Sequence, residues 1–293
     1  MTDAAKGDNL TIAIVNWNTR DLLLHALGSI YGQIGIAPPR VVVVDNASHD
    51  GSVEAVRTNY PQCEVIANRE NVGYARGNNQ VLESCTDEYA LLLNPDVVLP
   101  SDGLRKALEF MHEHPRAGAL GVRQVHPNGD LQRSVRGFPT PAGIVCEITG
   151  LSRLLPRSRW AGSYRMTWLD YKHVEEVDQP MGTFLLLRSS VLKEIGILDE
   201  QFPIFFNEVD WCLRCKRAGW KIYFTPEVEI IHHGGAGTSQ AGAAMAWESR
   251  RALLTFYRKH YSNPIYLPLR LFVAAASWPH AWLQALKRNR ARP

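Results

Sequence analysis

The feature that most constrains the fold is an alternation of short runs rich in valine, isoleucine and leucine with longer amphipathic stretches. The runs have the length of buried strands and lie at residues 11–17, 40–45, 64–68, 89–94, 118–125, 183–188 and 221–226. Stretches at 19–31 and 101–114 carry apolar residues at helical spacing. This order predicts an α/β fold with a mostly parallel central sheet flanked by helices.

The chain length allows one such domain and little more. With 293 residues, we expect an α/β domain of about 250 residues and a short appendage. Residues 126–180 break the alternation with several prolines and two tryptophans. We expect an irregular insertion over the sheet there, in a position to hold a second substrate.

The charge balance excludes one class of function. The chain has 32 basic and 29 acidic residues, a formal net charge of +3 and no dominant charged block, so we expect no nucleic-acid partner. Five unevenly spaced cysteines agree with a reducing compartment. No apolar signal segment precedes the strand expected near Leu10, which predicts a cytoplasmic protein.

Polar side chains follow three of the first four predicted strands. Asn16 and Asn18 follow the first strand, and Asp45 follows the second. Asn94 and Asp96 follow the fourth. Any one of them alone is better explained as a turn residue. Because the carboxyl ends of parallel strands meet at one edge of a sheet, where ligands bind, the group together predicts a binding site.

Four segments resemble the family 2 glycosyltransferases, and most closely the bacterial rhamnosyltransferase-like branch that builds surface polysaccharide. They are VDNASHDGS (44–52), NRENVGYARGNN (68–79), LLLNPDV (91–97) and residues 182–235, which include FFNEVDWCLRCKRAGW (205–220). The resemblance implies the GT-A fold, with a Rossmann-like donor-nucleotide half at about 10–125 and an acceptor-binding half at about 126–262. Residues 263–293 then form a separate tail.

The resemblance also implies a site for a nucleoside-diphosphate sugar. Asp45 matches the acid that receives the N3–H of a pyrimidine base, although an Asx-turn explains it as well. Arg76 lies among glycines that let the backbone approach a ribose or diphosphate closely. Gly73 to Gly77 lacks the third glycine of a dinucleotide fingerprint, which disfavours a nicotinamide enzyme. The expected donor-binding residues are Asn16, Asn18, Asp45, Asn46, Arg76, Asn94 and Asp96.

Asp96 is the expected ligand of a divalent cation, Mg²⁺ or Mn²⁺. A diphosphate gains negative charge as the sugar leaves, so a cation at the leaving group is required. Family members usually carry Asp-x-Asp at this strand end, whereas Asn94 replaces the first aspartate here. One carboxylate suits a cation that also takes diphosphate oxygens and waters.

The segment 205–220 predicts a helix with Asn207 as its N-cap and with Glu208 and Asp210 in its first turn. Acids there stabilise a helix through its dipole whether or not they have a catalytic role. By resemblance, Glu208 matches the general base of inverting members. Asp210 is then expected to orient it or to bind acceptor hydroxyls. The expected acceptor-binding residues are Gly182, Thr183 and Trp211, for which a place in the core is the alternative.

Cysteine and histidine residues raise zinc as a rival explanation. Cys212 and Cys215 form Cys-x-x-Cys, but no second such pair exists and adjacent histidines lack the spacing of a zinc finger. A spacing of three on a helix more simply points both cysteines into the core. In related enzymes a histidine after the base helix touches the metal or diphosphate, which implies such a role for His232 or His233.

The tail at 263–293 combines aromatic and aliphatic residues with a basic end. Pro268 and Pro279 interrupt its apolar run, which is shorter than the ~20 residues of a spanning helix. We expect peripheral contact with the inner face of the cell membrane. The alternative is a helix docked on the domain or on a second subunit in a homodimer.

The resemblance implies an inverting enzyme that moves L-rhamnose from a dTDP- or UDP-sugar to a hydroxyl of a saccharide or of a polyprenyl-diphosphate-linked saccharide. No residue distinguishes L-rhamnose from another hexose. The alternative from a different class is a catalytically degenerate sugar-nucleotide-binding protein that has lost its metal with the aspartate that Asn94 replaces.

Overall fold

The computed structural model describes residues 10–155, 157–234 and 242–290. Its elements alternate along the chain as the sequence predicts. The first eight are β1 (Leu10–Asn16), α1 (Arg20–Tyr31), β2 (Arg40–Asp45), α2 (Ser52–Asn59), β3 (Glu64–Ala67), α3 (Tyr74–Leu82), β4 (Tyr89–Leu93) and β5 (Val97–Val98). Next come α4 (Gly103–Glu113) and β6 (Ala117–Val125).

The main sheet contains ten strands within the described residues. Eight of them follow the order β3-β2-β1-β4-β11-β6-β12-β5, while β7 pairs with β6 and β9 with β12. Strands β3, β2, β1 and β4 are parallel. Strand β11 (Phe184–Arg188) is antiparallel to β4 and β6, and β12 (Lys221–His232) is parallel to β6. The mostly parallel sheet predicted from the sequence is therefore confirmed.

Alternate residues of the central strands enter two different hydrophobic cores. Ile12 and Ile14 pack on the side of α1 and α4, whereas Ala13 and Val15 pack on the side of α3, α7 (Ser189–Ile195) and α8 (Asn207–Arg217). Side chains point alternately to the two faces of a strand. A strand that is covered on both faces must therefore be apolar at every position, which explains the continuous apolar runs in the sequence.

The insertion at 126–180 is more ordered than the sequence predicted. It contains β7 (Leu131–Gln132), β8 (Val135–Arg136), α5 (Pro141–Ile148), α6 (Leu151–Leu154), β9 (Glu175–Glu176) and β10 (Gln179–Pro180). Tyr171 anchors it to the sheet, since its buried ring packs edge-on against Phe224 and its hydroxyl accepts a hydrogen bond from Val135 N. The insertion thereby covers the sheet beside β12.

Strand β12 also extends beyond its predicted end. The sequence predicted a strand at 221–226, but pairing with β6 resumes after an irregularity between Thr225 and Glu229 and continues to Ile231. The end of β12 then pairs with β5, so that His232 lies opposite Val97. The extension therefore brings His232 next to the start of β5, directly after Asp96.

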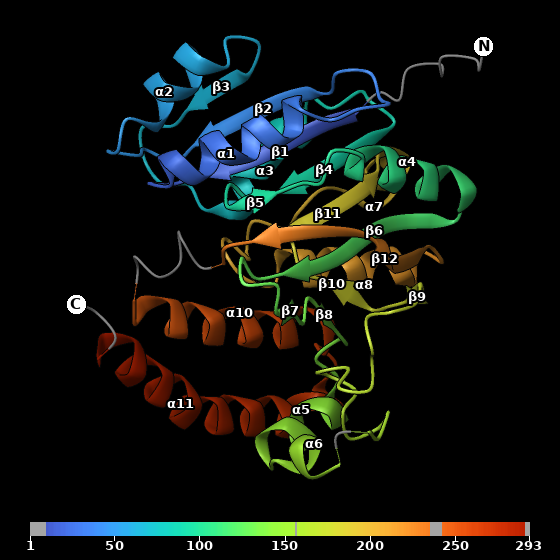
Figure 1. Cartoon of the computed structure of the whole chain (residues 1–293). Coiled ribbons are helices and arrows are strands. Elements are labelled where there is room, and N and C mark those ends of the chain that lie inside the picture. Colours follow the sequence, from blue (N-terminus) through green and yellow to red (C-terminus); the bar gives the residue numbers. More distant parts are fainter. Residues whose placement is uncertain (1–9, 156, 235–241, 291–293) are drawn as a thin grey trace.

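Two long helices lie below the sheet in Figure 1, α10 (Ala244–His260) and α11 (Leu267–Arg290), joined by a short 3₁₀ turn (Pro264–Tyr266). Helix α11 runs through Pro279, so the expectation that this proline interrupts the segment is wrong. Val273, Ala281 and Ala285 are its buried positions. No helix among the described residues is long and apolar enough to cross a membrane. The tail's Arg292 lies outside those residues.

Candidate functional site

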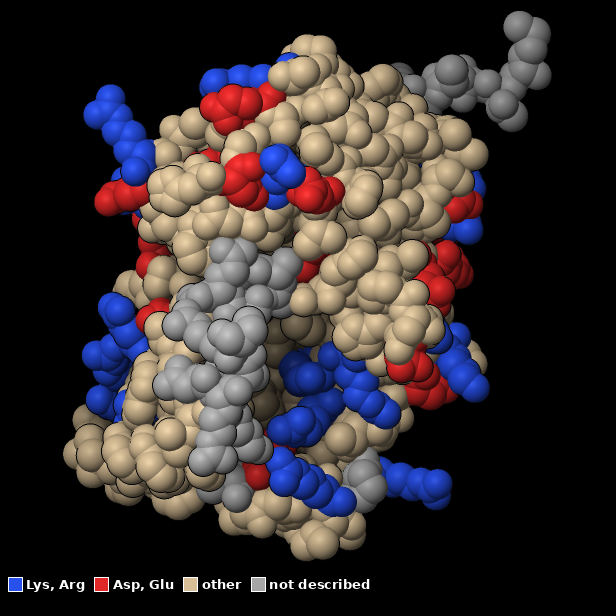
Figure 2. Space-filling view, turned by 60° about the vertical axis from the view of Figure 1, so that its left-hand side comes forward, with Lys and Arg blue, Asp and Glu red and all other residues tan. Residues whose placement is uncertain are grey.

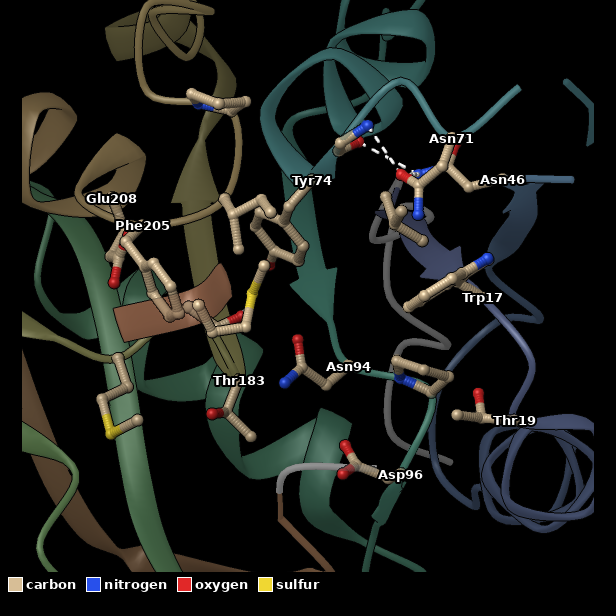
Figure 3. Close-up of a pocket in the computed structure, with 18 of the residues that line it drawn as sticks. Trp17, Thr19, Asn46, Asn71, Tyr74, Asn94, Asp96, Thr183, Phe205 and Glu208 are labelled. Carbon is tan, nitrogen blue, oxygen red and sulfur yellow. Dashed lines mark hydrogen bonds between the residues drawn. The ribbon is translucent and has the colours of Figure 1, made fainter. Parts of the chain in front are cut away.

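A cavity of about 540 Å³ opens at the carboxyl ends of the strands. Its volume is typical of a site for a small organic ligand. Figure 3 shows Trp17 and Thr19 on one side and Glu208 and Phe205 on the other, with the strand-end segment that carries Asp96 between them. The predicted residues that line it are Asn46, Asn94, Asp96, Gly182, Thr183, Glu208 and His232.

Asp96 and His232 come together at the floor of this cavity. Asp96 Oδ1 lies 3.3 Å from His232 Nε2, and the two residues are only 4% and 6% exposed. Gln132 Oε1, in the insertion, accepts a hydrogen bond from His232 Nδ1 at 2.7 Å, and Gln132 Nε2 donates to His232 O. His233 N donates to Asp96 O, but the His233 side chain is exposed and does not line the cavity.

This pair fits a shared cation site and does not fit an all-protein one. The buried His232 Nε2 forms no hydrogen bond within the described residues. Within the same residues no group of three or more His, Cys, Asp or Glu side chains is placed to hold a metal ion. A carboxylate and an imidazole beside an open cavity suit a divalent cation that takes its other ligands from a diphosphate and water.

Asn94 and Thr183 extend this side of the cavity. Asn94 N donates to Thr183 O at 2.9 Å, which joins the end of β4 to the residue before β11. In Figure 3 both side chains lie on the side of Asp96 that faces Glu208 and Phe205. Tyr74 donates its hydroxyl hydrogen to Gly182 O at 2.8 Å. Gly182 and Thr183, two of the three residues expected at the acceptor, line the same cavity as Asp96.

Glu208 stands in the apolar wall of the cavity. Phe205 and Ile204 lie beside it in the lining, and burial raises its pKa to about 7 although main-chain N–H groups of Glu208 and Val209 favour the charged form. Burial, followed by the nearby Glu208 charge, raises the pKa of Tyr74. A carboxyl group with a pKa near neutrality can accept a proton at physiological pH.

The backbone before Glu208 is held in an unusual conformation. Phe206 has φ +70°, in the left-handed region that non-glycine residues rarely adopt. Such a conformation costs about 1–3 kcal/mol and persists only where the surrounding structure imposes it. Here the Phe206 ring packs edge-on against Phe256 of α10. The packing of Phe206 therefore holds the residue just before α8 and with it the position of Glu208.

A family model described as glycosyl transferase family 2 matches residues 11–196, more than half of the chain. The chain belongs to this family. It is 27% identical over 274 residues to an N-acetylglucosaminyl-diphospho-decaprenol L-rhamnosyltransferase of Mycobacterium tuberculosis, which covers 87% of each protein. It is 24% identical to a rhamnosyltransferase of Escherichia coli over 150 residues, 50% of this chain and 53% of the other. The protein is accordingly a glycosyltransferase.

Solved structures agree on the fold. A mannosyltransferase from Pyrobaculum calidifontis, in complex with GDP-Man and Mn²⁺, is similar with a TM-score of 0.59 and 19% identity over 99% of this chain and 76% of that one. Staphylococcus aureus TarS is similar with a TM-score of 0.54 and 16% identity over 96% of this chain and 79% of that one. These likenesses confirm the GT-A fold.

Three residues predicted to bind the donor form hydrogen bonds within the loops of this glycosyltransferase. Asn16 donates to Asp45 Oδ1 at 2.8 Å, and Asp45 Oδ2 accepts from Ser48 N at 2.9 Å. Asn18 Oδ1 accepts from His49 N. None of Asn16, Asn18 and Asp45 lines the cavity. Asp45 thus forms a turn, which was the alternative explanation of this residue. Its contact with the pyrimidine base of a nucleotide stays a prediction.

The glycine-rich segment of the glycosyltransferase serves packing. A Cβ on Gly73, whose φ is +86°, would lie 2.8 Å from Pro203 O, which accepts hydrogen bonds from Tyr74 N and Ala75 N. The close approach is thus to the protein's own Pro203. Arg76 is exposed and does not line the cavity. Asn46 does, and it donates to Asn71 Oδ1 and Gly73 O at 3.2 Å.

Three predictions for α8 are wrong. Asn207 is the first helical residue and Phe206 the N-cap, because the Asn207 side chain donates backward to Ile204 O at 2.9 Å. Trp211 is fully buried, with Nε1 donating to Gly196 O at 3.0 Å, so it offers no face to a sugar. Asp210 is also fully buried and faces away from the cavity.

Cys212 and Cys215 are both buried in the core as free thiols, which supports the simpler explanation of their spacing.

Asp210 instead joins α8 to α10. Its carboxylate lies 2.8 Å from Arg214 Nε, 2.6 Å from Lys259 Nζ and 2.7 Å from His260 Nε2. Burial alone would raise its pKa, but the hydrogen bonds from His260, Lys259 and Arg214 outweigh that effect and lower the pKa to about 2. Asp210 is therefore a structural acid that fixes α8 beside α10.

The sequence did not point to several residues that complete the cavity. Tyr74 lies in the segment 68–79 and Trp17 at the end of the first predicted strand, but the sequence indicated no role for either residue. Gln132, which orients His232, lies 100 residues away in sequence, and no motif or spacing indicated a role for it. Others that line the cavity are Thr19, Asn71, Met181, Phe205 and Met245.

Proposed function

We propose that this glycosyltransferase is an inverting, cation-assisted enzyme that moves L-rhamnose from a dTDP- or UDP-sugar to a saccharide hydroxyl. The acceptor is carried on a polyprenyl diphosphate in the synthesis of a bacterial surface polysaccharide. One observation carries the proposal: a carboxyl group with a pKa of about 7, that of Glu208, shares a cavity with the Asp96–His232 pair.

The proposed roles follow from the two sides of the cavity. Inversion requires a base that takes the proton of the acceptor hydroxyl while the sugar carbon is attacked from the face opposite the diphosphate. Glu208 supports this role because its carboxyl group is buried in an apolar wall rather than paired with a cation within the described residues. The Asp96–His232 pair supports a place for the diphosphate on the other side.

A divalent cation bound by Asp96 and His232 would offset the charge that develops on the leaving diphosphate. Asn94 offers a neutral amide where other family members carry an aspartate. Thr183 and Asn94 hold the sugar-facing side of the site through the hydrogen bond between their main chains. The Mn²⁺ of the similar mannosyltransferase structure supports the choice of cation.

The choice of sugar and acceptor rests on relatives. The mycobacterial and Escherichia coli proteins are both named rhamnosyltransferases, and the first is named for an N-acetylglucosaminyl-diphospho-decaprenol acceptor. The similarity to the mycobacterial protein spans 87% of both chains. L-Rhamnose and a lipid-linked N-acetylglucosamine are therefore the first substrates to test.

The test combines dTDP-L-rhamnose, Mn²⁺ and a short-chain polyprenyl-diphospho-N-acetylglucosamine. The expected result is release of dTDP and a product whose new linkage has the anomeric configuration opposite to that of the donor, read by NMR. Retention of configuration would contradict the role of Glu208 as a base. Faster transfer from another nucleotide sugar in a parallel panel would contradict L-rhamnose while leaving the glycosyl transfer itself intact.

A protein that binds sugar nucleotides without turnover is the second candidate, and Asn94 favours it because it removes one carboxylate from the expected metal site. The same assay distinguishes the two. A binding protein would gain thermal stability from the donor but release no nucleoside diphosphate with Mn²⁺ and acceptor present.

A further inference from the structure

A second cavity, of about 340 Å³, lies between α10 and α11. Its wall combines arginines with leucines. Arg250, Arg251 and Arg258 come from α10 and Arg270 comes from α11, and the rest of the lining is Leu254, Tyr257, Leu267, Leu271 and Ala274. Figure 2 shows several lysine and arginine side chains in the lower part of the molecule, the part that contains α10 and α11 in Figure 1. We call this cavity the arginine groove.

The positive charge of the arginine groove is poorly compensated by the protein. Within the described residues, Arg251 is the one member of the four with an ion pair, and its Nη1 lies 3.8 Å from Glu248 Oε2. Arg250 donates to the main-chain Ala274 O, and its buried Nε has no acceptor there. Arg258 donates to the hydroxyl of Thr255. A buried guanidinium N–H without an acceptor is costly, so these groups favour an anion from outside.

An exposed apolar stripe lies next to the arginine groove. Leu267, Leu271, Trp278, Trp282 and Leu286 recur along α11 at intervals of helical spacing, and each is at least 39% exposed. Val273, which is buried in the same helix, lies well off this stripe. Tryptophan and leucine on one face of a helix too polar to span a bilayer are typical of a helix that lies in a membrane surface.

We propose that the arginine groove binds the phosphate of an anionic phospholipid and that the apolar stripe of α11 lies in the bilayer around it. The planar fork of a guanidinium matches the oxygens of a phosphate group. A soluble phosphate would satisfy the arginines but leave the stripe in water. A phospholipid surface satisfies both at once, because it presents phosphates beside an apolar layer.

This proposal does not depend on the sugar, the acceptor or the base proposed above. Helix α10 nevertheless joins the two sites, since Met245 near its first turn lines the donor cavity and Arg250 lines the arginine groove. Five residues of helix span about 8 Å along its axis. A bilayer held at the groove would therefore lie close to the helix end that reaches the donor cavity.

The test is flotation of the full-length protein with vesicles of phosphatidylcholine alone or of phosphatidylcholine with phosphatidylglycerol. The intact protein is expected to float with the anionic vesicles only. The double variant Arg258→Gln, Arg270→Gln removes two groove charges without touching the Arg250 hydrogen bond to Ala274. Loss of one basic residue near an anionic surface weakens binding roughly fivefold, so the pair should weaken it roughly 25-fold.

The matched control is Arg57→Gln, Lys193→Gln, which removes two exposed charges from α2 and α7. It is expected to float like the intact protein. Equal loss in the control, or equal flotation with both kinds of vesicle, would overturn the proposal. Displacement from vesicles by inorganic phosphate, beyond that by sodium chloride of the same ionic strength, would show a soluble-phosphate site and would also overturn it. Circular dichroism and donor binding confirm that each variant is folded.

Discussion

Glu208 and Asp210 are two residues apart in the first turn of α8, yet their surroundings on the two faces of the helix shift their pKa values in opposite directions. On the cavity face, burial raises the pKa of Glu208 to about 7. On the α10 face, burial acts in the same direction on Asp210, but His260, Lys259 and Arg214 reverse it and bring the pKa to about 2. The first turn of one helix thus holds a proton acceptor and a fixed charge.

The difference teaches which carboxylate is available for chemistry. Both acids favour the helix dipole equally well by position, so their place in the turn does not distinguish them. Their partners do, because an acid whose carboxylate already accepts hydrogen bonds from His260, Lys259 and Arg214 does not take up a proton near neutral pH. An acid in an apolar wall can accept a proton near neutral pH. Its burial destabilises the folded protein when the pH rises above the ordinary pKa of the acid.

The largest expected effect comes from removing the proton acceptor on the cavity face. Glu208→Gln keeps the shape of the side chain and is expected to lower kcat by roughly 10²–10⁴-fold, the usual contribution of a general base. Donor affinity should change little, because the diphosphate lies on the other side of the cavity. Steady-state transfer kinetics together with calorimetric titration of the donor provide the measurement.

Two results would break this assignment. A Glu208→Gln enzyme with more than about a tenth of the original kcat would show that Glu208 is not the base. In the wild-type enzyme, kcat/KM should fall about tenfold for each pH unit below the Glu208 pKa of about 7. A flat profile between pH 5 and 7, by contrast, would place the essential proton acceptor elsewhere.

The next effect concerns the α10 face and stability rather than rate. Asp210→Asn leaves Lys259, His260 and Arg214 without their shared carboxylate. Breaking a buried ion pair by removing one partner costs about 3–5 kcal/mol of the free energy of unfolding. Urea unfolding measures it, and kcat per folded molecule should stay within about tenfold of the original.

A double-mutant cycle with Lys259→Gln sharpens this result. If the two side chains act as one cluster, the double variant should lose less stability than the sum of the single losses. Additive losses would mean that Lys259 stabilises the protein independently of Asp210. A rate loss as large as that of Glu208→Gln would contradict the division of roles between the two faces.

The sequence predicted the sheet because its signal is local. Strands covered on both faces must be continuously apolar, and helices between them must be amphipathic, so the order of elements follows from neighbouring residues. The position of Asp96 at the edge of the sheet could also be predicted, because a polar residue that follows a buried parallel strand lies at the edge where ligands bind. His232 was found only as one of two adjacent histidines.

What the sequence did not predict depends on distant contacts. The position of His232, rather than His233, beside Asp96 follows from the pairing of β12 with β5 and from Gln132, which lies 100 residues earlier. The role of Asp210 follows from Lys259 and His260, about 50 residues later. No spacing within the segment 205–220 encodes those partners.

A smaller effect of about 3 kcal/mol is expected in the pH dependence of stability. The Glu208 pKa rises on folding from 4.5 to about 7, so the folded protein binds the proton more tightly and loses stability as pH rises through that window. The Asp210 pKa falls from 3.8 to about 2, so its contribution is present above 3.8 and lost as pH falls toward 2. Urea unfolding from pH 3 to 8 should therefore show Glu208→Gln gaining on the wild type between pH 4.5 and 7.

The smallest effect is expected from His232→Gln, which tests whether the floor of the cavity acts separately from both faces of α8. His232 is proposed to share a cation with Asp96, and losing one ligand of a shared site should reduce the Mn²⁺-dependent gain in nucleoside-diphosphate affinity roughly tenfold. Without Mn²⁺ the affinity should be unchanged. Calorimetric titration with and without Mn²⁺ measures both, and Asp96→Asn, as the matched variant, should abolish the gain because it removes the carboxylate. If His232→Gln keeps the full gain while Asp96→Asn loses it, the histidine serves only to position Asp96. If both keep the gain, the cation binds elsewhere and the cavity floor has another role.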